Sequence, residues 1–239
     1  MAFAGGLGVA STAAQAALNR RMAVVGRMPY RVWIRLLAPL FAVWIHSTQA
    51  TPSHDWAGAL ALFEPNSGRY RPEFAFVRRQ PGLISGIRSD GLDVLWYAPG
   101  QSGHGASLPV AELGVRFIGS NAHAPMAGQQ ASAGSANYFV SADPSTWQRN
   151  IALYESVVTY GVYPGIDVHY HRDGRWLEFD FIVAEGVDPT VIRMKFSGAQ
   201  MPALDDDGHL VFPALPGMPR LRAPVVYQDV AGRRRQLQG

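Results

Sequence analysis

After residue 50, apolar and polar residues alternate in short runs that are separated, about every ten residues, by turn-forming residues. An alternation with a period of two places every second side chain on the same face of a β-strand. Turn-forming sequences of the expected kind occur at Ser89–Gly91, Arg172–Gly174 and Asp206–Gly208. Only Ser145–Ile151 suggests a helical turn. The pattern predicts an all-β protein, either an antiparallel β-sandwich or a barrel-like domain.

The predicted strands are short and follow one another from residue 59 to residue 229. In chain order they are Ala59–Phe63, Glu73–Arg78, Leu83–Arg88, Leu92–Tyr97, Leu113–Ile118, Asn137–Val140, Ser156–Tyr160, Ile166–His171, Arg175–Ala184, Val191–Ser197, His209–Phe212 and Val225–Asp229. The segment Ala122–Ala136 is rich in Gly, Ala, Ser and Gln, and we expect it to be a mobile loop.

One hairpin can be assigned a register from the sequence. If Asp173-Gly174 is a two-residue turn, Arg172 faces Arg175 and the remaining pairs follow outward. The resulting apolar pairs all lie on one face of the hairpin: Tyr170 with Leu177, Val168 with Phe179, and Ile166 with Phe181. Because a slip of one residue would move these side chains to the other face, the apolar pattern supports this register.

The opposite face of this hairpin carries the chain's densest group of ionisable side chains. The predicted register puts His171 opposite Trp176, His169 opposite Glu178, and Asp167 opposite Asp180. Imidazole and carboxylate ligands together suit a divalent metal, so Asp167, His169, His171, Glu178 and Asp180 are candidate metal ligands. The alternative is a solvated face with ordinary cross-strand pairs, in which an arginine rather than a metal lies between the carboxylates.

The first fifty residues have the features of a secretory signal peptide. Arg31 and Arg35 form a positive region, Leu36–Ile45 is apolar, and Thr48 and Ala50 stand at positions −3 and −1 of a cut after Ala50. The sequence therefore predicts a targeting segment at 1–50 and a β-rich domain at 51–239. It also predicts export, to the periplasm, the cell surface or the medium.

Two alternatives remain open for this segment. It could be an uncleaved N-terminal anchor, in which case it would be the chain's contact with a membrane. The stretch before Met28 is unusual in front of a signal peptide, so Met28 or Met22 is the expected start of translation.

The charge distribution argues against nucleic-acid binding. The whole chain has 21 basic and 18 acidic residues, but five of the arginines and none of the acidic residues lie in the first fifty. The rest of the chain has 16 basic residues against 18 acidic ones, a net charge of about −2. A nucleic-acid binder would need a basic face with interspersed aromatic residues.

Sequence patterns of the common enzyme classes are missing. There is no His-Glu-x-x-His, no phosphate-binding glycine loop and no Gly-x-Ser-x-Gly, and Gly100–Gly105 reads as a flexible loop. Glu178 and Asp180 could in principle form a glycosidase pair, but this spacing is common in ordinary strands. Asp205–Gly208 lacks the ligand pattern of a calcium loop and is better explained as a hairpin turn. No cysteine is present. The sequence thus predicts no catalytic residues and no cofactor beyond the candidate metal.

A series of short segments, in order and spacing, resembles a known bacterial domain. The segments are Phe63–Gly68, Val115–Gly119, Asn137–Val140, Asp143–Trp147, Tyr163–Asp167, Leu177–Phe181, Gly186–Pro189, Phe196–Ala199 and Pro224–Gln228. The chain is similar to the uncharacterised domain found at the start of secreted proteins that carry seven-bladed β-propeller-type (SBBP) repeats. The resemblance spans about residues 60 to 229 and is most specific in the second half.

This resemblance implies an exported β-rich module without assigned chemistry, whose partners are other domains or repeats of a longer exported protein. One departure is Asn66–Arg69, where the family often has Asn-x-Gly-Gln. The other is the end at Gly239, where the resemblance implies further strands, so we expect the domain to be truncated at its C-terminus.

Two functions follow as expectations. The first is a non-catalytic structural or interaction module of an exported envelope or surface protein. The second is a module that binds an envelope glycan or a metal, for which Trp96, Tyr97 and Trp176 are the candidate stacking residues. Coplanar aromatic rings on an open face would favour the second function, and buried rings would favour the first.

Overall fold

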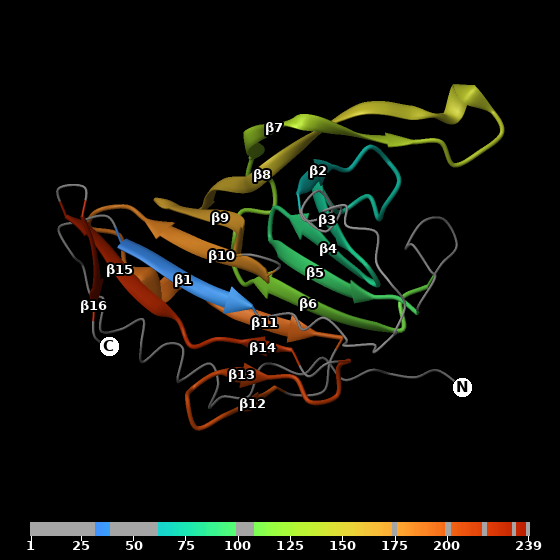
Figure 1. Ribbon diagram of the computed structural model, residues 1–239. Coiled ribbons are helices and arrows are strands. Elements are labelled where there is room, and N and C mark those ends of the chain that lie inside the picture. The colour runs from blue at the N-terminus through green and yellow to red at the C-terminus, as the bar shows by residue number, and fades with distance from the viewer. Residues whose placement is uncertain are drawn as a thin grey trace.

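The computed structural model describes residues 32–38, 62–98, 108–173, 176–198, 202–216, 219–230 and 233–237. Within these residues the protein consists of β-strands and two 3₁₀ turns, η1 (Pro144–Thr146) and η2 (Pro189–Val191), as Figure 1 shows. The prediction of an all-β, antiparallel fold is confirmed. The predicted cleavage site after Ala50 and the loop Gly100–Gly105 lie outside the described residues.

Over most of the chain, the strands begin and end near the turns that the sequence predicts. In order they are β1 (Val32–Ala38), β2 (Phe63–Pro65), β3 (Phe76–Gln80), β4 (Leu83–Arg88), β5 (Gly91–Trp96), β6 (Ala111–Phe117), β7 (Met126–Tyr138), β8 (Gln148–Tyr163), β9 (Ile166–Asp173), β10 (Trp176–Val183), β11 (Met194–Ser197), β12 (Ala203–Leu204), β13 (Leu210–Val211), β14 (Arg220–Leu221), β15 (Val225–Val230) and β16 (Arg233–Leu237).

Thirteen strands form one antiparallel sheet that curls into a half-barrel (Figure 1). Its order is β11-β6-β5-β4-β3-β2-β8-β9-β10-β1-β15-β16, and β7 is attached to β8 outside this path. The two halves of the curled sheet meet through aromatic side chains. Phe117 of β6 lies 5.0 Å from Phe181 and 6.0 Å from Phe179, both in β10. Tyr170 of β9 donates a hydrogen bond to the carbonyl of Gly91, which begins β5.

The apolar core fills the concave side of the sheet. Phe63, Val94, Leu113, Val168 and Phe181 are between 0 and 5% exposed, although they come from strands that are far apart in the sequence. Cross-strand partners share a face, so the alternation of each strand delivers its apolar residues to this common core. A small second cluster of Phe74, Val77, Ile84 and Leu95 covers the outer face of β3 to β5.

The hairpin of β9 and β10 has the predicted faces but a different register. Trp176 pairs with Asp173, Phe179 with Tyr170, and Phe181 with Val168. The predicted register, with Leu177 opposite Tyr170, is therefore wrong by two residues. Because side chains alternate with a period of two, a shift of two leaves every apolar residue on the core face.

The segment Ala122–Ala136, predicted as a loop, forms most of β7 instead. β7 and β8 pair over a long antiparallel ladder and extend away from the body as a two-stranded arm (Figure 1). The ladder contains register shifts between Ala131 and Ser135 and between Ala136 and Tyr138. The hairpin also contacts the body near its turn, where the side-chain amide of Gln148 exchanges two hydrogen bonds with Ser67.

Part of the predicted signal peptide is a strand of the sheet. β1 lies between β10 and β15 and runs antiparallel to both. Its register places Ile34 opposite Phe181 on one side and opposite Val226 on the other. Residues 32–38 thereby join two segments that are more than 40 positions apart in the chain.

The C-terminal part closes one side of the core. β12, β13 and β14 form a separate small sheet, and Phe212 beside it packs 5.4 Å from Phe196 of β11. The hairpin turn predicted at Asp206–Gly208 is present, with Gly208 donating a hydrogen bond to the carbonyl of Asp205. The predicted last strand, Val225–Asp229, corresponds to β15, which pairs with β16.

Candidate functional site

The polar face of the β9–β10 hairpin brings together four of the five predicted metal ligands. Nε2 of His171 lies 3.2 Å from Oδ2 of Asp180 and 3.8 Å from Oε2 of Glu178. Both carboxylates are nearly inaccessible, with 1% of Glu178 and 2% of Asp180 exposed. The ring of His169 lies 5.2 Å from that of His171. His171 therefore lies within reach of two buried carboxylates.

The fifth predicted ligand has another role. Asp167 stands opposite Ile182 rather than opposite Asp180, and its Oδ1 accepts a hydrogen bond of 2.7 Å from the backbone N–H of Gly161. This bond supports the bend at the end of β8, where Gly161 has a φ of 61°. The predicted opposition of Asp167 and Asp180 is wrong because the register differs by two residues. Arg35 of β1 holds the register position opposite Asp180.

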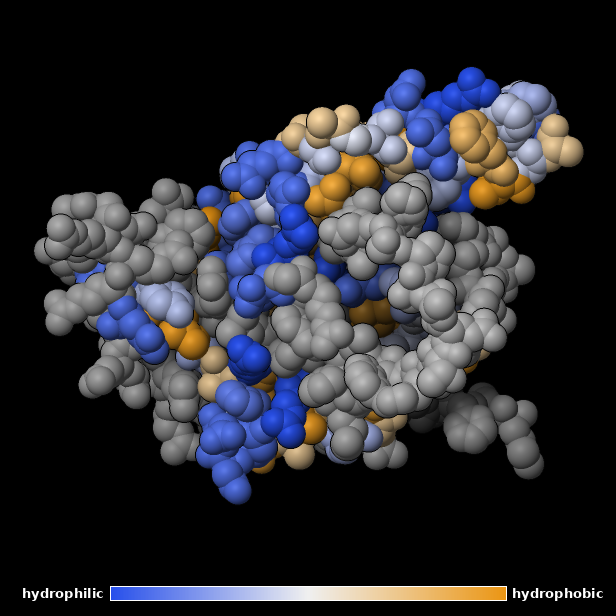
Figure 2. Space-filling model, in the orientation of Figure 1, coloured by the Kyte–Doolittle hydropathy of each residue, from blue (hydrophilic) through white to orange (hydrophobic). Residues whose placement is uncertain are grey.

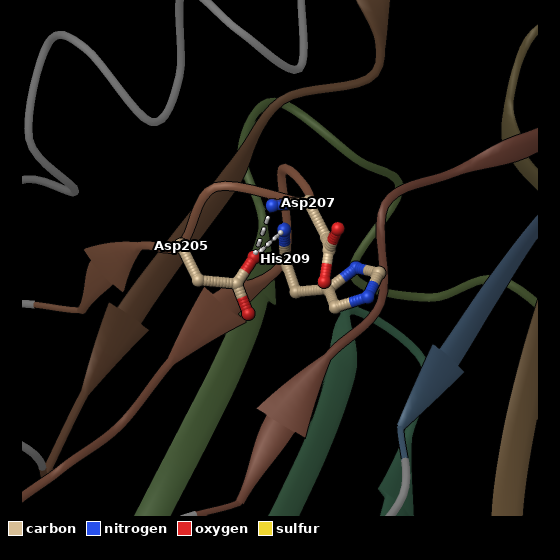
Figure 3. Close-up of side chains that lie close together, drawn as sticks. All are labelled: Asp205, Asp207 and His209. Atoms are coloured by element: carbon tan, nitrogen blue, oxygen red, sulfur yellow. Dashed lines mark hydrogen bonds between the residues drawn. The ribbon is translucent and has the colours of Figure 1, made fainter.

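Within the described ranges, a group of three or more potential metal ligands whose ligand atoms lie within 4.8 Å of one another occurs at a different place (Figure 3). It consists of Asp205, Asp207 and His209, in the turn between β12 and β13. Oδ1 of Asp205 accepts the backbone N–H groups of Asp207 and His209, which explains the turn without an ion. Nδ1 of His209 accepts the backbone N–H of Ala223 at 2.9 Å. In a neutral imidazole the other nitrogen, Nε2, then carries the proton, so neither nitrogen offers a free lone pair.

The candidate stacking residues do not form a platform. Trp96 is 6% exposed and belongs to the main core, so its ring cannot stack on a ligand. Tyr97 is half-buried against the second cluster, next to Leu95. The side chain of Trp176 lies outside the described residues. The assignment of Trp96 as a stacking residue is wrong, because alternation alone does not tell which face of β5 is covered.

Exposed apolar side chains gather instead at the tip of the arm. Phe139 is 57% exposed and Val140 61% exposed. The rings of Phe139 and Trp147 meet edge to face, with centroids 5.0 Å apart and an interplanar angle of 81°. The guanidinium of Arg149 lies over both rings, 5.1 Å from that of Trp147 and 5.5 Å from that of Phe139. We call these four residues the arm tip; in Figure 2 apolar and polar residues lie side by side along the projecting arm.

The arm tip is held in shape by its own hydrogen bonds. Nε1 of Trp147 donates to the carbonyl of Ser141 at 2.9 Å. The carboxylate of Asp143 accepts the backbone N–H and the hydroxyl of Ser145, which starts the 3₁₀ turn η1. Asp-Pro before a short turn is a combination that favours this cap. Phe139, Val140 and Trp147 belong to segments that carry the family resemblance. No pattern in the sequence indicated that Phe139 and Val140 would be exposed.

A buried carboxylate holds the far end of the arm's ladder, where Tyr138 pairs with Gln148 directly before the turn that carries the arm tip. Glu64 of β2 is 3% exposed, and both of its carboxylate oxygens accept the hydroxyl of Tyr138 at 2.6 Å. Nε of Arg79 lies 3.2 Å from the same carboxylate, and the hydroxyl of Tyr70 donates to it at 3.4 Å. The guanidinium of Arg69 lies 3.8 Å above the Tyr138 ring. Burial and the negative charge of Glu64 raise the pKa of Tyr70 to about 12.

A second buried ion pair lies on the outer face of the sheet. Asp93 of β5 is 1% exposed, and both of its oxygens bind Nη2 of Arg116 in β6, at 2.6 and 2.8 Å. Burial raises the pKa of Asp93 despite this arginine. Gly114 makes room for the pair, because a Cβ there would lie 2.9 Å from the Asp93 carboxylate and 2.5 Å from Ser197. Side-chain size at position 114 is therefore restricted.

None of the helices in the described part of the chain reaches the length and hydrophobicity that a membrane span requires. No curated protein and no solved structure shows significant similarity to the chain. A family model does match, from residue 63 to residue 239, and so covers every strand except β1. The chain belongs to the family described as a domain of unknown function, DUF7948.

Proposed function

We propose that this chain is a non-catalytic interaction module of an exported bacterial protein, and that the arm tip makes the contact with its partner. The observation that carries this proposal is the exposure of Phe139 and Val140, at 57% and 61%, on an arm that projects from the body. Apolar side chains held in the open by a fixed turn are typical of protein contact sites. Aromatic residues and arginine are also the residues enriched at the centre of such contacts.

The partner that fits best is another domain or repeat of the same longer exported protein. A resemblance to domains that precede SBBP repeats supports this choice, and the predicted signal peptide supports export. The arm tip offers one cation and two aromatic rings in a small area, which suits a protein surface with a shallow apolar pocket and an acidic rim.

Glycan binding is supported less well. Flat sugar rings stack on aromatic faces, whereas Phe139 and Trp147 meet edge to face at 81° and Trp96 is buried. Catalysis has little support at the predicted polar face, because Glu178 and Asp180 are 1% and 2% exposed. A substrate would have to displace neighbouring strands to reach them.

The test is site-specific photo-crosslinking of the full chain in its own cells. A photoreactive residue replaces Phe139 in one variant and Val191 in the control, because Val191 is also an exposed apolar residue, at 44%, but lies away from the arm. We expect a defined protein adduct from position 139 only, in the fraction outside the cytoplasm. Equal adducts from both positions, a glycan adduct, or a protein confined to the cytoplasm would each contradict the proposal.

A further inference from the structure

A strand from outside the family domain completes the main sheet. The family match begins at Phe63, whereas β1 comprises Val32–Ala38. Twenty-four residues, 39 to 62, separate the two in the sequence. β1 nevertheless occupies an interior position, with seven paired residues toward β10 and four toward β15. The part of this chain that the family model matches therefore lacks one interior strand of the sheet.

The strand directions show that this gap cannot close by a simple shift. β10 and β15 both run antiparallel to β1, so they are parallel to each other. With β1 between them they lie about 9–10 Å apart, twice the usual spacing of neighbouring strands. Without β1, each would expose a row of backbone N–H and C=O groups, which is the template that recruits another strand.

The walls of the gap also define which segment fits. On the core side, β10 contributes Phe179, Phe181 and Val183, each at most 1% exposed, and β15 contributes Val226 at 7%. On the other side, β10 contributes the buried carboxylates of Glu178 and Asp180. An occupant thus needs apolar residues at alternate positions and is favoured by a cation opposite the acids. In the register of β1, Val32, Ile34 and Leu36 stand opposite the apolar row, and Arg35 stands opposite Asp180.

We infer that the space between β10 and β15 is a strand-acceptor site, which binds an extended apolar protein segment with a central cation as an added β-strand, and that Val32–Ala38 is its exchangeable occupant. Backbone hydrogen bonds on both sides supply affinity, and the alternate side-chain positions supply selectivity. This inference is independent of the arm tip and of the partner proposed for it.

The experiment uses the full chain with a recognition sequence for a site-specific protease inserted after Ala50. After cleavage, the fragment 1–50 should stay bound to the rest of the chain in size-exclusion chromatography. A labelled synthetic peptide of residues 30–40 should then displace it in a saturable manner. The same peptide with Ile34→Pro should compete at least about tenfold less well, since proline removes a ladder hydrogen bond and is not tolerated in the middle of a sheet.

Two controls separate strand addition from simple adhesion. The peptide with Arg31→Ala changes a residue beyond the seven paired positions and should bind within about twofold of the original, a difference below roughly 0.4 kcal/mol. The peptide with Arg35→Glu should bind more weakly, because it places a carboxylate opposite Asp180. Loss of the fragment with no change in melting temperature, or equal competition by the Ile34→Pro peptide, would overturn the inference.

If the cleaved protein precipitates, hydrogen exchange of the uncut chain decides the question. The variant Ile34→Pro should accelerate amide exchange in both Leu177–Val183 and Val225–Gln228, the two walls of the site. The ladder of β4 and β5, which β1 does not contact, is the internal control. Unchanged exchange in both walls would show that β1 does not hold them.

Discussion

The hydroxyl of Tyr138 donates to both carboxylate oxygens of Glu64, at 2.6 Å each, and so joins the arm to β2 across 74 positions of sequence. Glu64 is 3% exposed, which makes this contact a charge-assisted hydrogen bond in a site of low polarity. Arg79 balances the charge from the side, with its Nε 3.2 Å from the carboxylate. The contact therefore fixes the far end of the arm's ladder to the body, because Tyr138 pairs with Gln148 directly before the turn.

Tyr138→Phe removes the hydroxyl and leaves one buried carboxylate with fewer donors. We expect the free energy of unfolding to fall by about 1–3 kcal/mol, the range for a buried group that loses a hydrogen bond to a charge. Denaturant titration measures it. The matched control is Tyr160→Phe, which removes a tyrosine hydroxyl on the exposed side of the arm, where it accepts from Gln129. That variant should change stability by less than about 0.5 kcal/mol, and equal losses in both would refute the role of Glu64.

The same cluster predicts a loss of stability in base. Burial, and then the charge of Glu64, raise the pKa of Tyr70 from 10.0 to about 12. The folded state therefore holds this proton more tightly than the unfolded state, so its stabilising effect is complete below about pH 10 and is lost as the pH rises toward 12. Tyr70→Phe should flatten the fall in unfolding free energy over this range. An identical slope in the wild-type protein and the variant would contradict the assignment.

The pair of Asp93 and Arg116 predicts an unusual response to acid. Arg116→Met leaves the buried Asp93 carboxylate without its bidentate partner, although Nη1 of Arg88 remains 3.9 Å away. We expect a loss of about 3 kcal/mol near neutral pH, at the lower end of the range for a broken buried ion pair. Burial raises the pKa of Asp93 even with Arg116 in place, and removal of the arginine raises it further.

This direction fixes the sign of the pH effect. A carboxyl group whose pKa is raised in the folded state stabilises the fold below its unfolded pKa, and this contribution is lost as the pH rises through the folded pKa. The Arg116→Met variant should therefore lie closer to the wild-type stability near pH 4 than near pH 7. Adding Asp93→Asn should recover part of the loss at neutral pH. A constant difference across this pH range would show that packing, not charge, sets the cost.

Metal removal tests the two clusters of candidate ligands together. His171 is engaged with Asp180 at 3.2 Å, and Nδ1 of His209 is engaged with Ala223 at 2.9 Å, so both sites are satisfied by the chain's own groups. We expect the purified full chain to keep its melting temperature in the presence of chelator. Bound metal detected by mass spectrometry, together with a chelator-dependent fall that His171→Ala or His209→Ala abolishes, would restore the metal hypothesis.

The arm tip should matter for binding and not for folding. Phe139→Ser combined with Val140→Ser replaces two side chains that are more than half exposed. Unfolding free energy should change by less than about 0.5 kcal/mol, because little buried surface is lost. For crosslinking, a photoreactive residue replaces Trp147. The protein adduct formed from position 147 should disappear when Phe139→Ser and Val140→Ser are introduced into the same chain. Retention of the adduct would place the contact elsewhere on the protein.

Local alternation predicted most strands correctly, because each strand buries one face. In the β9–β10 hairpin, Val168 and Phe181 were placed on the correct face, but the register differed by two residues. Two registers that differ by two give the same faces, so the apolar pattern cannot distinguish them. Only the turn decides, and Asp173, which favours turns, is the last paired residue of β9 instead.

β7 shows where sequence patterns fail. Ala131 to Gly134 have low β-propensity and no alternation; Ala131 pairs with Tyr154 of β8, and the next three residues lie in a register shift before Ser135 pairs with Ala152. The contact of Glu64 with Tyr138 could not be predicted from the sequence either, because the two residues are 74 positions apart. Contacts between residues that the curvature of the sheet brings together are not predicted by local sequence patterns.

The place of β1 has a consequence for the timing of synthesis. If Val32–Ala38 serves as part of an export signal that is not removed by a cut after Ala50, the same seven residues act first at the membrane and then as a strand of the sheet. Export and folding then compete for the same segment. A chain that folds before export would bury residues 32–38 in the sheet, where the export machinery cannot bind them. Because β15 extends to Val230, both neighbours of β1 exist only after that residue has been synthesised, and until then residues 32–38 stay available to the export machinery.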